Sequence, residues 1–225
     1  MFVKICGVTN VEDALLAAGL GADAVGLNFV ASSQRRITAN TAKEIVRRLP
    51  PEVLSVGIFR DERKERVVSA ANQIGLRVVQ LHGHESPEET RWVAERIPNV
   101  IRAFSAGSPE LKRLNEFGEI QLLLDSPQPG SGKPFDWSRL AGDPPSLPYI
   151  LAGGLTPDNL GEAVAMLEPW GVDVASGVER SPGVKDPVKM QRFIATARSV
   201  APSDRDEPRD GDQIFGGPFD WEDDN

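Results

Sequence analysis

The stretch VKICGVTNVEDALLAAGL, residues 3–20, contains one complete strand–helix unit of the predicted fold. β-Branched and apolar residues favour a strand over 3–7, which closes at a glycine. Asn10 then stands where a helix N-cap is expected, and Asp13 is placed like the acid of a capping box. Apolar residues at helical spacing follow, so we predict a helix over 10–20.

The same unit recurs along the chain as far as residue 199. Short apolar runs, typical of strands covered on both faces, predict strands at 3–7, 24–29, 54–59, 77–83, 100–105, 120–125, 149–154 and 172–177. Helices are predicted at 10–20, 39–49, 62–74, 86–97, 108–117, 136–140, 157–167 and 186–199. An open doubly wound sheet usually has fewer strands. Eight units with short connections therefore predict one α/β domain, a closed (β/α)8 TIM barrel over residues 1–200.

Several predicted helix ends carry capping chemistry. Candidate N-caps followed by a first-turn proline are Ser86-Pro87, Thr156-Pro157 and Asp186-Pro187. Glycines near helix ends, where a left-handed C-cap suits glycine, are Gly19, Gly21 and Gly75.

The composition is that of an ordinary globular protein. Apolar residues make up 40% of the chain, and the single cysteine cannot form an internal disulfide. The first residues lack a basic region followed by an apolar run, and no apolar stretch is long enough to cross a membrane. We therefore expect a cytoplasmic protein with no membrane association.

The net charge of −8 lies almost wholly in residues 201–225, which contain nine acidic and two basic side chains. The rest of the chain is nearly neutral and offers no basic face for a nucleic acid. Rich in Asp, Pro and Gly, this segment is predicted to be an acidic tail, disordered or loosely docked. Its PFDW at 218–221 repeats PFDW at 134–137. The repeat is either a coincidence or a sign that the tail docks on a surface that the internal copy also uses.

In a barrel of this kind, the active site lies at the carboxyl ends of the strands. Cys6 ends the first predicted strand, and Asp125 ends the sixth. A lone cysteine is often just a small buried residue, whereas a carboxylate that closes an apolar run is rare unless it is paired or functional. Facing each other across a bound sugar, this thiol and this carboxyl can act as base and acid.

Glycine-rich loops follow the last two strands, LAGGLTPDN at 151–159 and VASGVERSPG at 174–183. Loops at these positions commonly bind phosphate, because glycine lets backbone N–H groups approach an anion. The glycines would also suit tight turns, but their presence in two consecutive units favours a phosphate site. A third loop, GSGK at 130–133, is either a further wall of the site or a lid over it.

Other polar residues also follow strands. Arg35 and Arg36 come after the second strand, and one of them is expected to point inward as a fork for a substrate carboxylate; a solvated loop is the alternative. His82 and His84 stand two residues apart, but Gly83 is expected to end the strand between them. With two histidines and one cysteine in the chain, no metal site is expected.

Taken in order, the motifs are KICGVTNVEDA, GADAVGLNF, VGIF, VQLHGHE, LLLDS with GSGKPFDW, LAGGLTPDN and VDVASGVERSPGVKD. Together they resemble the phosphoribosylanthranilate isomerase family of tryptophan biosynthesis, over about residues 2–199. KICG combined with DVASGVE is specific to that family, whereas the phosphate loops alone are shared by several sugar-phosphate barrels.

The resemblance implies a cofactor-free Amadori rearrangement of N-phosphoribosyl anthranilate to 1-(2-carboxyphenylamino)-1-deoxyribulose 5-phosphate. It implies that Asp125 is the general acid, that Cys6 as a thiolate is the general base, and that Arg35 binds the anthranilate carboxylate. It places His82 and Asp173 in the pocket lining, and a phosphate cradle at Gly153, Gly154, Ser176 and Gly177. The implied partner is the small-molecule substrate; the sequence leaves a monomer and a homodimer equally open.

This chemistry requires opposite adjustments of the two groups. A free cysteine has a pKa of roughly 8.5, so the pKa of Cys6 must be tuned downward for a base near neutrality. Asp125 must instead keep its proton at working pH, which desolvation at an apolar strand end favours. No lysine or histidine adjacent to Cys6 in sequence is expected to tune it.

Three alternatives remain open. The isomerase of histidine biosynthesis runs the same rearrangement with paired aspartates, one of them at the end of strand one, where this chain has Cys6. An indole-forming synthase needs a lysine–glutamate set on its strands and a longer N-terminus, and this chain has only Lys4 near the first strand. A non-catalytic phospholigand sensor needs the glycine loops but neither the acid nor the base.

Overall fold

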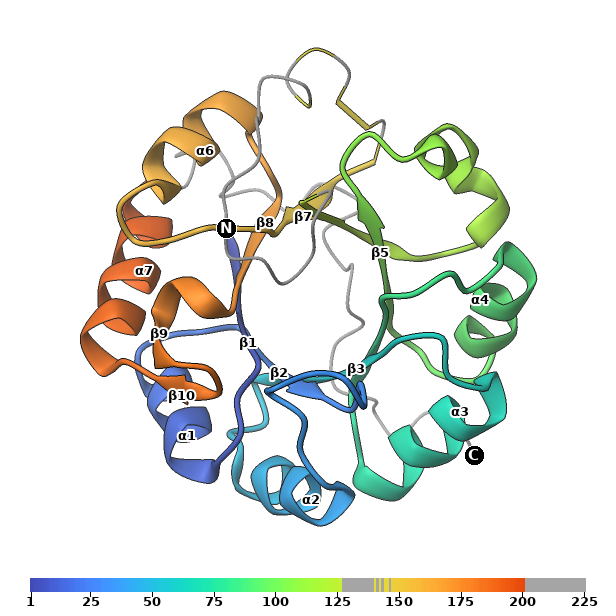
Figure 1. Cartoon of the computed structure of the whole chain (residues 1–225), viewed down its shortest axis with the longest axis horizontal. Coiled ribbons are helices and arrows are strands. Elements are labelled where there is room, and N and C mark those ends of the chain that lie inside the picture. Colours follow the sequence, from blue (N-terminus) through green and yellow to red (C-terminus); the bar gives the residue numbers. More distant parts are fainter. Residues whose placement is uncertain (127–139, 141, 143, 146, 201–225) are drawn as a thin grey trace, which may run out of the picture.

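Eight parallel strands close into a barrel, with helices around its outside (Figure 1). The computed structural model describes residues 1–126, 140, 142, 144–145 and 147–200. Strand β1 pairs with both β2 and β8, so that Lys4 is in register with Ala24 on one side and Asp173 on the other. The predicted (β/α)8 barrel is confirmed.

The barrel strands follow the order of the chain around the ring. They are β1 (Phe2–Cys6), β2 (Ala24–Asn28), β3 (Leu54–Phe59), β4 (Val78–Leu81), β5 (Val100–Ser105), β6 (Gln121–Asp125), β7 (Tyr149–Leu151) and β8 (Gly171–Val174). A two-stranded sheet, which the sequence analysis did not predict, follows β8 and consists of β9 (Glu179–Ser181) and β10 (Val184–Lys185).

The helical segments lie between the strands. They are α1 (Val11–Gly19), α2 (Ala39–Arg48), α3 (Lys64–Ile74), α4 (Pro87–Ala94), η1 (Pro109–Phe117), α6 (Leu160–Leu167), η2 (Ser176–Val178) and α7 (Pro187–Ser199). η1 and η2 are 3-10 segments, and η1 is kinked at Arg113, whereas a regular helix was predicted over 108–117.

The N-caps follow the sequence signals at three of four positions. Asn10 accepts a hydrogen bond from the Asp13 backbone, but the Asp13 carboxylate accepts from the Asn10 side chain rather than its backbone. Ser86 forms a complete capping box, and Asp186 caps α7. Thr156 caps the turn that precedes α6 rather than α6 itself: its hydroxyl accepts from the Asn159 N–H and its own N–H donates to Asn159 Oδ1, but α6 begins at Leu160 with Asn159 as its N-cap.

The predicted glycine C-caps are confirmed in part. Gly75 ends α3 in the left-handed conformation. Gly19 is the last residue of α1 rather than its cap; the C-cap is Leu20, and Gly21 follows at φ 94°. The left-handed cap of α6 is Glu168, a residue that carries no glycine signal.

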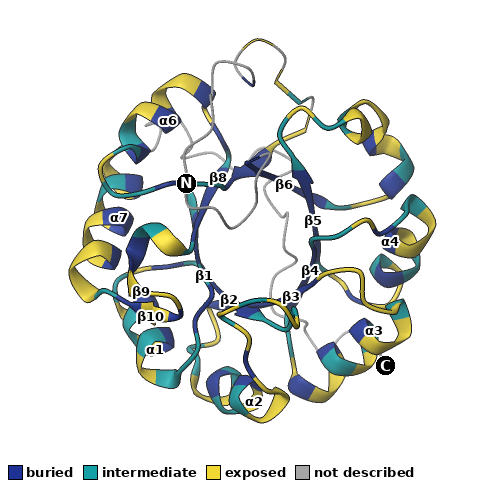
Figure 2. Ribbon diagram, in the orientation of Figure 1, coloured by how far each residue is buried: buried dark blue, intermediate teal, exposed yellow. Residues whose placement is uncertain are grey.

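Alternating strand residues build two separate apolar layers. One set fills the barrel interior and consists of Ala24, Leu54, Val56, Val78, Ile101, Ala103, Leu123, Ile150 and Ala152. The residues between them, such as Val25 and Leu27, pack outward against the helices. The strands are therefore buried on both faces (Figure 2), as continuous apolar runs require. The same alternation points Lys4 and Cys6 inward.

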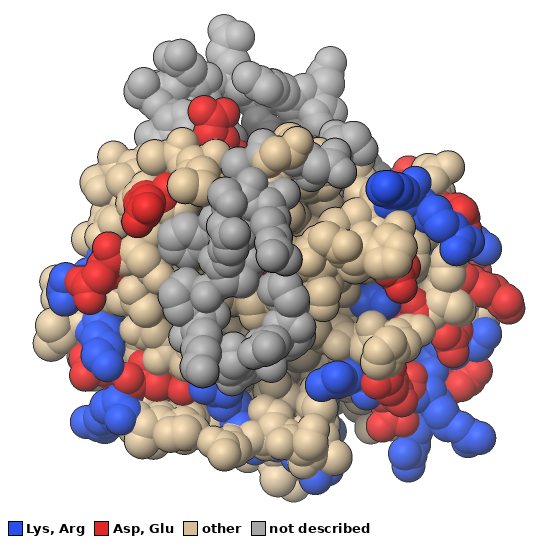
Figure 3. Space-filling model, turned by 45° about the horizontal axis from the view of Figure 1, so that its top comes forward, with Lys and Arg blue, Asp and Glu red and all other residues tan. Residues whose placement is uncertain are grey.

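Charges of both signs are intermixed on the face seen in Figure 3. None of the helices in the described part of the chain combines the length and apolar character that crossing a membrane requires. The predicted helix near 136–140, the GSGK loop, the acidic tail and both PFDW segments lie mostly or wholly outside the described residues.

Candidate active site

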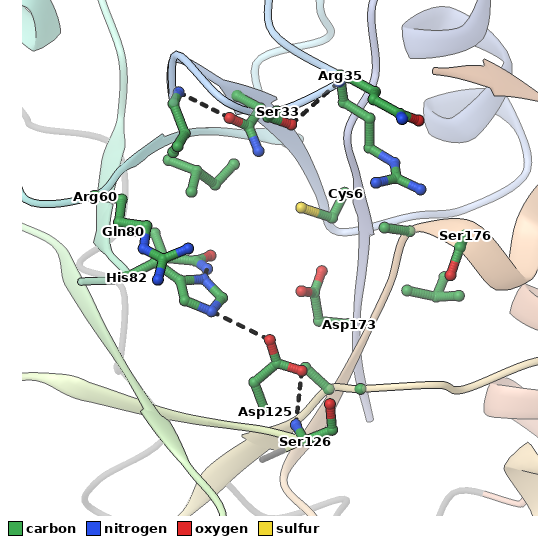
Figure 4. Close-up of a pocket in the computed structure, with 18 of the residues that line it drawn as sticks. Cys6, Ser33, Arg35, Arg60, Gln80, His82, Asp125, Ser126, Asp173 and Ser176 are labelled. Carbon is green, nitrogen blue, oxygen red and sulfur yellow. Dashed lines mark hydrogen bonds and ion pairs between the residues drawn. The ribbon is translucent and has the colours of Figure 1, made fainter. Parts of the chain in front are cut away.

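A cavity of about 500 Å³ lies at the carboxyl ends of the barrel strands (Figure 4). It collects most of the site residues predicted from the sequence. Those in its lining are Cys6, Arg35, His82, Asp125, Gly153, Gly154, Asp173 and Ser176. Gly177 is not in the lining. Residues far apart in the chain therefore meet here because each ends a neighbouring strand or begins the loop after it.

Asp125 is the last residue of β6, and it is buried, with 7% of its surface exposed. Its Oδ1 accepts a hydrogen bond of 2.7 Å from the Ser126 backbone N–H. Its Oδ2 lies 3.2 Å from Nε2 of His82. One oxygen is thus anchored to the backbone, and the other faces an imidazole that can exchange a proton with it.

Cys6 lies at the end of β1, and its sulfur points into the cavity (Figure 4). Lys4, two residues earlier on the same face, is fully buried and donates a 2.9 Å hydrogen bond to Oδ1 of Asp173. The charge of Lys4 favours the thiolate of Cys6 and acts to lower the pKa of this thiol. A buried cation and a buried anion therefore stand next to the only cysteine in the chain.

The pKa of Cys6 is raised, not lowered as the sequence analysis expected. Burial is the largest cause, because it disfavours the thiolate, and the negative charge of Asp173 adds to it. Lys4 and Lys185 act in the opposite direction without overcoming burial. The tuning groups are thus two lysines brought to the thiol by the fold, one of them from the far end of the chain.

Arg35 reaches the cavity from the loop after β2 and is held by Glu179. Its Nε and Nη2 donate to the two carboxylate oxygens of Glu179 at 2.8 and 2.7 Å. This bidentate contact is the main cause that raises the pKa of Arg35. Arg36 instead lines a different cavity on the outer side of β2 and β3, so Arg35 alone of the pair faces the site.

Lys185 is buried beneath Glu179. Its Nζ donates to Oε1 of Glu179 at 3.0 Å and to the carbonyl oxygens of Cys6 and Ala175. Burial outweighs the attraction of Glu179 and lowers the pKa of Lys185. This lysine thus joins the backbone of β1 to the loop after β8.

Gly153 and Gly154 form the loop after β7, with φ of 88° and 72°. A Cβ on Gly153 would come within 2.5 Å of the Ser126 nitrogen and 2.8 Å of Asp125 Oδ1. Only glycine permits this approach. Among the described residues, neither glycine N–H donates a hydrogen bond, so both remain available to an anion in the cavity.

Gly177 has a packing role in this geometry. A Cβ there would lie 1.9 Å from the carbonyl oxygen of Leu155, so its lack of a side chain lets the loops after β7 and β8 touch. Ser176, just before it, is exposed and lines the cavity. The two loops predicted to form the cradle are therefore in direct contact.

Several polar residues of the site were not identified from the sequence. Asn28, Arg60, Gln80 and Ser126 line the cavity, and Lys4, Glu179 and Lys185 support it from behind. Lys4 stands two residues before Cys6 on β1, and Gln80 stands two residues before His82, which directly follows β4. Because side chains alternate along a strand, this spacing is a signal that could have identified both residues. Within the described ranges, no three His, Cys, Asp or Glu side chains are arranged to hold a metal ion.

Comparison with known proteins gives a consistent result. The family model described as N-(5'phosphoribosyl)anthranilate (PRA) isomerase matches residues 3–196. The N-(5'-phosphoribosyl)anthranilate isomerase of Desulforudis audaxviator (strain MP104C) is 47% identical over 205 residues, covering 88% of this chain and 98% of that protein.

Solved structures agree with the sequence relatives. The crystal structure of phosphoribosyl anthranilate isomerase from Thermotoga maritima is 42% identical with a TM-score of 0.82, covering 88% of this chain and 99% of that one. A phosphoribosyl anthranilate isomerase in complex with reduced 1-(o-carboxyphenylamino)-1-deoxyribulose 5-phosphate is 40% identical with a TM-score of 0.80, at the same coverage.

Proposed function

The chain belongs to the N-(5'-phosphoribosyl)anthranilate isomerase family, and from this membership we propose how its cavity carries out the reaction. The protein is an intramolecular aldose–ketose isomerase of tryptophan biosynthesis that acts on a small-molecule substrate. A cytoplasmic location is proposed with it, since that is where a soluble phosphorylated intermediate of amino-acid synthesis is made and used.

Asp125 is the general acid of the proposed mechanism. Because Oδ1 accepts from the Ser126 N–H, the proton is delivered from Oδ2 to the ring oxygen of the ribose. The carbon–oxygen bond of the ring then breaks, and the nitrogen lone pair forms a protonated Schiff base with the first sugar carbon.

Cys6, as a thiolate, is the general base. It removes the proton from the second sugar carbon, and the electron pair moves toward the Schiff-base nitrogen, giving an enolamine. The enolamine gains a proton on the first carbon and releases the proton of its enol hydroxyl, which gives the ketose. No net proton is gained or lost, and the substrate nitrogen serves as the electron sink in place of a cofactor.

Arg35 and the glycine loops hold the two ends of the substrate. Glu179 engages Nε and Nη2 of Arg35, which leaves the Nη1 donors for the anthranilate carboxylate. The N–H groups of Gly153 and Gly154 have no acceptor within the described ranges, and together with Ser176 on the adjoining loop they bind the phosphate. The sugar between them is then placed over Cys6 and Asp125.

The observation that carries the proposal is that Cys6 and Asp125 line one cavity together with Arg35, Gly153 and Gly154. The test is to incubate the purified protein with freshly made phosphoribosylanthranilate and to follow the loss of anthranilate-type fluorescence. An enzyme gives a loss proportional to protein concentration. A non-catalytic sensor binds the compound without turnover, and loss at the background rate would overturn the proposal.

A further inference from the structure

Three side chains form a row in the cavity wall. Gln80 Nε2 lies 2.8 Å from Nδ1 of His82, and Nε2 of His82 lies 3.2 Å from Oδ2 of Asp125 (Figure 4). Gln80 lies on β4, and His82 directly follows its last residue with its N–H still paired to the Phe59 carbonyl beside it, so both side chains project into the cavity. The imidazole is therefore held from both ring nitrogens, by an amide on one side and by the proposed acid on the other.

The amide of Gln80 has one atom without a partner. The side chain is 1% exposed, and its Oε1 has no hydrogen-bond partner among the described residues. An unpaired buried amide oxygen is costly, so a function for it needs to be sought. In this orientation of the amide, Nε2 faces Nδ1 of His82, and it donates to Nδ1 in the tautomer that leaves this ring nitrogen unprotonated.

This arrangement defines the proton count of the His82–Asp125 pair. With Nδ1 accepting from Gln80, the single ring proton is on Nε2 and is donated to a carboxylate Oδ2. The pair then holds one proton, which is its state after an acid has given its proton away. To act as an acid again, the pair must hold two protons.

In the two-proton state, Nδ1 of His82 is protonated, and the second proton lies on Nε2 or on Oδ2 of Asp125. Nδ1 then needs an acceptor. If the Gln80 amide turns by about 180°, its Oε1 faces this N–H and can accept from it. The two ends of an amide have nearly the same shape, so the rotation requires no repacking of the neighbouring side chains. The same side chain thus serves both proton counts.

We propose that Gln80 is a positioning residue for the general acid, whose amide donates to His82 when the His82–Asp125 pair is spent and accepts from it when the pair is loaded. The inference rests on the proposed role of Asp125 as the acid. Gln80 acts through His82 and does not itself transfer the proton.

Other charged or titratable groups face His82 and stay the same when Gln80 is substituted. They are Arg60 after β3, His84 and Glu85 on the loop after β4, Arg102 on β5, and Cys6 and Asp173 across the cavity. A difference between the wild type and Gln80→Met therefore reports on the loss of the amide, whereas Gln80→Glu replaces the amide by an acceptor and also adds a negative charge beside His82.

The experiment is NMR spectroscopy of the full chain labelled with ¹⁵N-histidine. The chain contains only two histidines, so the spectrum is simple to assign. His84→Asn removes the second signal; this side chain is 86% exposed and lies outside the reaction cavity. The ¹⁵N shifts of His82 are followed against pH in this background, alone and with Gln80→Glu or Gln80→Met. We expect the Nε2–H tautomer at high pH without further substitution. With Gln80→Glu, which can only accept, we expect the doubly protonated ring to persist to higher pH.

The kinetic readout is kcat and KM against pH. In Gln80→Met, the side chain can neither donate to His82 nor accept from it. We expect kcat to fall about 10- to 100-fold, which is part of what a general acid or base contributes, and KM to change little. Gln80→Glu, which is close in shape and guards against a folding failure, is expected to move the pH optimum of kcat upward.

Gln121→Met is the matched control. Gln121 is also a buried glutamine of the barrel interior, but its amide donates to the carbonyls of Leu122 and Pro148, away from the cavity. The control should leave the His82 signals and the pH profile unchanged.

Two results would overturn the inference, namely identical His82 signals with and without Gln80→Glu, or an equal kinetic effect of Gln121→Met. Failure of the proposed function looks different, because Asp125→Asn would then turn over as fast as the wild type.

Discussion

Cys6 combines a raised pKa with two nearby lysines. Burial disfavours its thiolate, while Lys4 and Lys185 favour it. Because the proton must leave the thiol before it can act as a base, kcat/KM is expected to rise with pH through the pKa of Cys6, above the ordinary range of a thiol. The raised pKa also means that the folded state holds the thiol proton more tightly than the unfolded chain does. This proton therefore stabilises the fold at pH values below the pKa of Cys6 in the unfolded chain. The stabilisation is lost as the pH rises through the pKa of Cys6 in the folded state.

Lys4→Met tests this electrostatic balance. The substitution removes a cation from the thiol and leaves Asp173 unpaired, and both changes raise the pKa of Cys6 further. The pH profile of alkylation by iodoacetamide should move to higher pH, and the measurement is clean because the chain has one cysteine. The exposed Lys43→Met serves as the control and should leave the profile in place. An unmoved profile in Lys4→Met would show that Lys4 does not tune the thiol.

Cys6→Ala tests the proposed base directly, and Asp125→Asn tests the proposed acid. Each should lower turnover by about 10²–10⁴, which is the usual contribution of a general acid or base. Both side chains sit at the cavity rather than in the apolar layers, so circular dichroism and thermal unfolding should show an intact fold. His84→Asn is the control. Near-wild-type turnover in either active-site variant would remove that residue from the mechanism.

At the level of secondary-structure elements, the loops after β7 and β8 touch because Gly177 has no side chain. Gly177→Ala would place a carbon 1.9 Å from a backbone oxygen, and only a shift of one loop relieves that. We expect a higher KM and a lower melting temperature. Gly161→Ala in α6 is the matched control, since its nearest neighbour is a flexible side-chain atom at 4.0 Å. That variant should be neutral or stabilising by up to about 1 kcal/mol. An unchanged KM in Gly177→Ala would exclude loop contact as a determinant of binding.

Helix caps and strands were predicted correctly where the residues that determine them are close together in the sequence. Ser86 and Asp186 cap helices as predicted because a cap involves only the next three residues. Thr156 carries the same signal, but its loop turns first and α6 begins only after Asn159. The β9–β10 pair escaped prediction because its strands are two or three residues long.

At the scale of the whole molecule, the cavity exists only when the ring is closed. Its lining comes from the ends of seven strands or the loops after them, among them β1 and β8, which join the two ends of the barrel. A ligand that fills it should therefore bind the folded chain and not the unfolded one. Reduced 1-(o-carboxyphenylamino)-1-deoxyribulose 5-phosphate at 100 times its Kd should stabilise the fold by about 2.7 kcal/mol.

Thermal unfolding with and without this compound measures the effect. Anthranilate alone, which can engage only the carboxylate end of the site, is the control and should give a smaller shift at the same concentration. Saturating binding without any rise in melting temperature would contradict a site that depends on the closed ring.

Patterns along the chain were enough to predict the closed eight-stranded barrel and the order of its strands. They also pointed to nine site residues, eight of which line the cavity. Apolar runs, caps and strand ends are local, and parallel strands bring their carboxyl ends to one rim whatever the details of packing. Period-two alternation would also have identified Lys4 beside Cys6 and Gln80 beside His82.

The hydrogen-bond partners of those residues and the shifts of their pKa values depend on the folded chain. Glu179 meets Arg35, and Lys185 meets the backbone of Cys6, through the path of the loop after β8. The direction of the pKa shift at Cys6 also required the fold, because it is the difference between burial, which raises it, and two lysines, which lower it. Such a difference depends on distances across the ring, which no local pattern in the chain encodes.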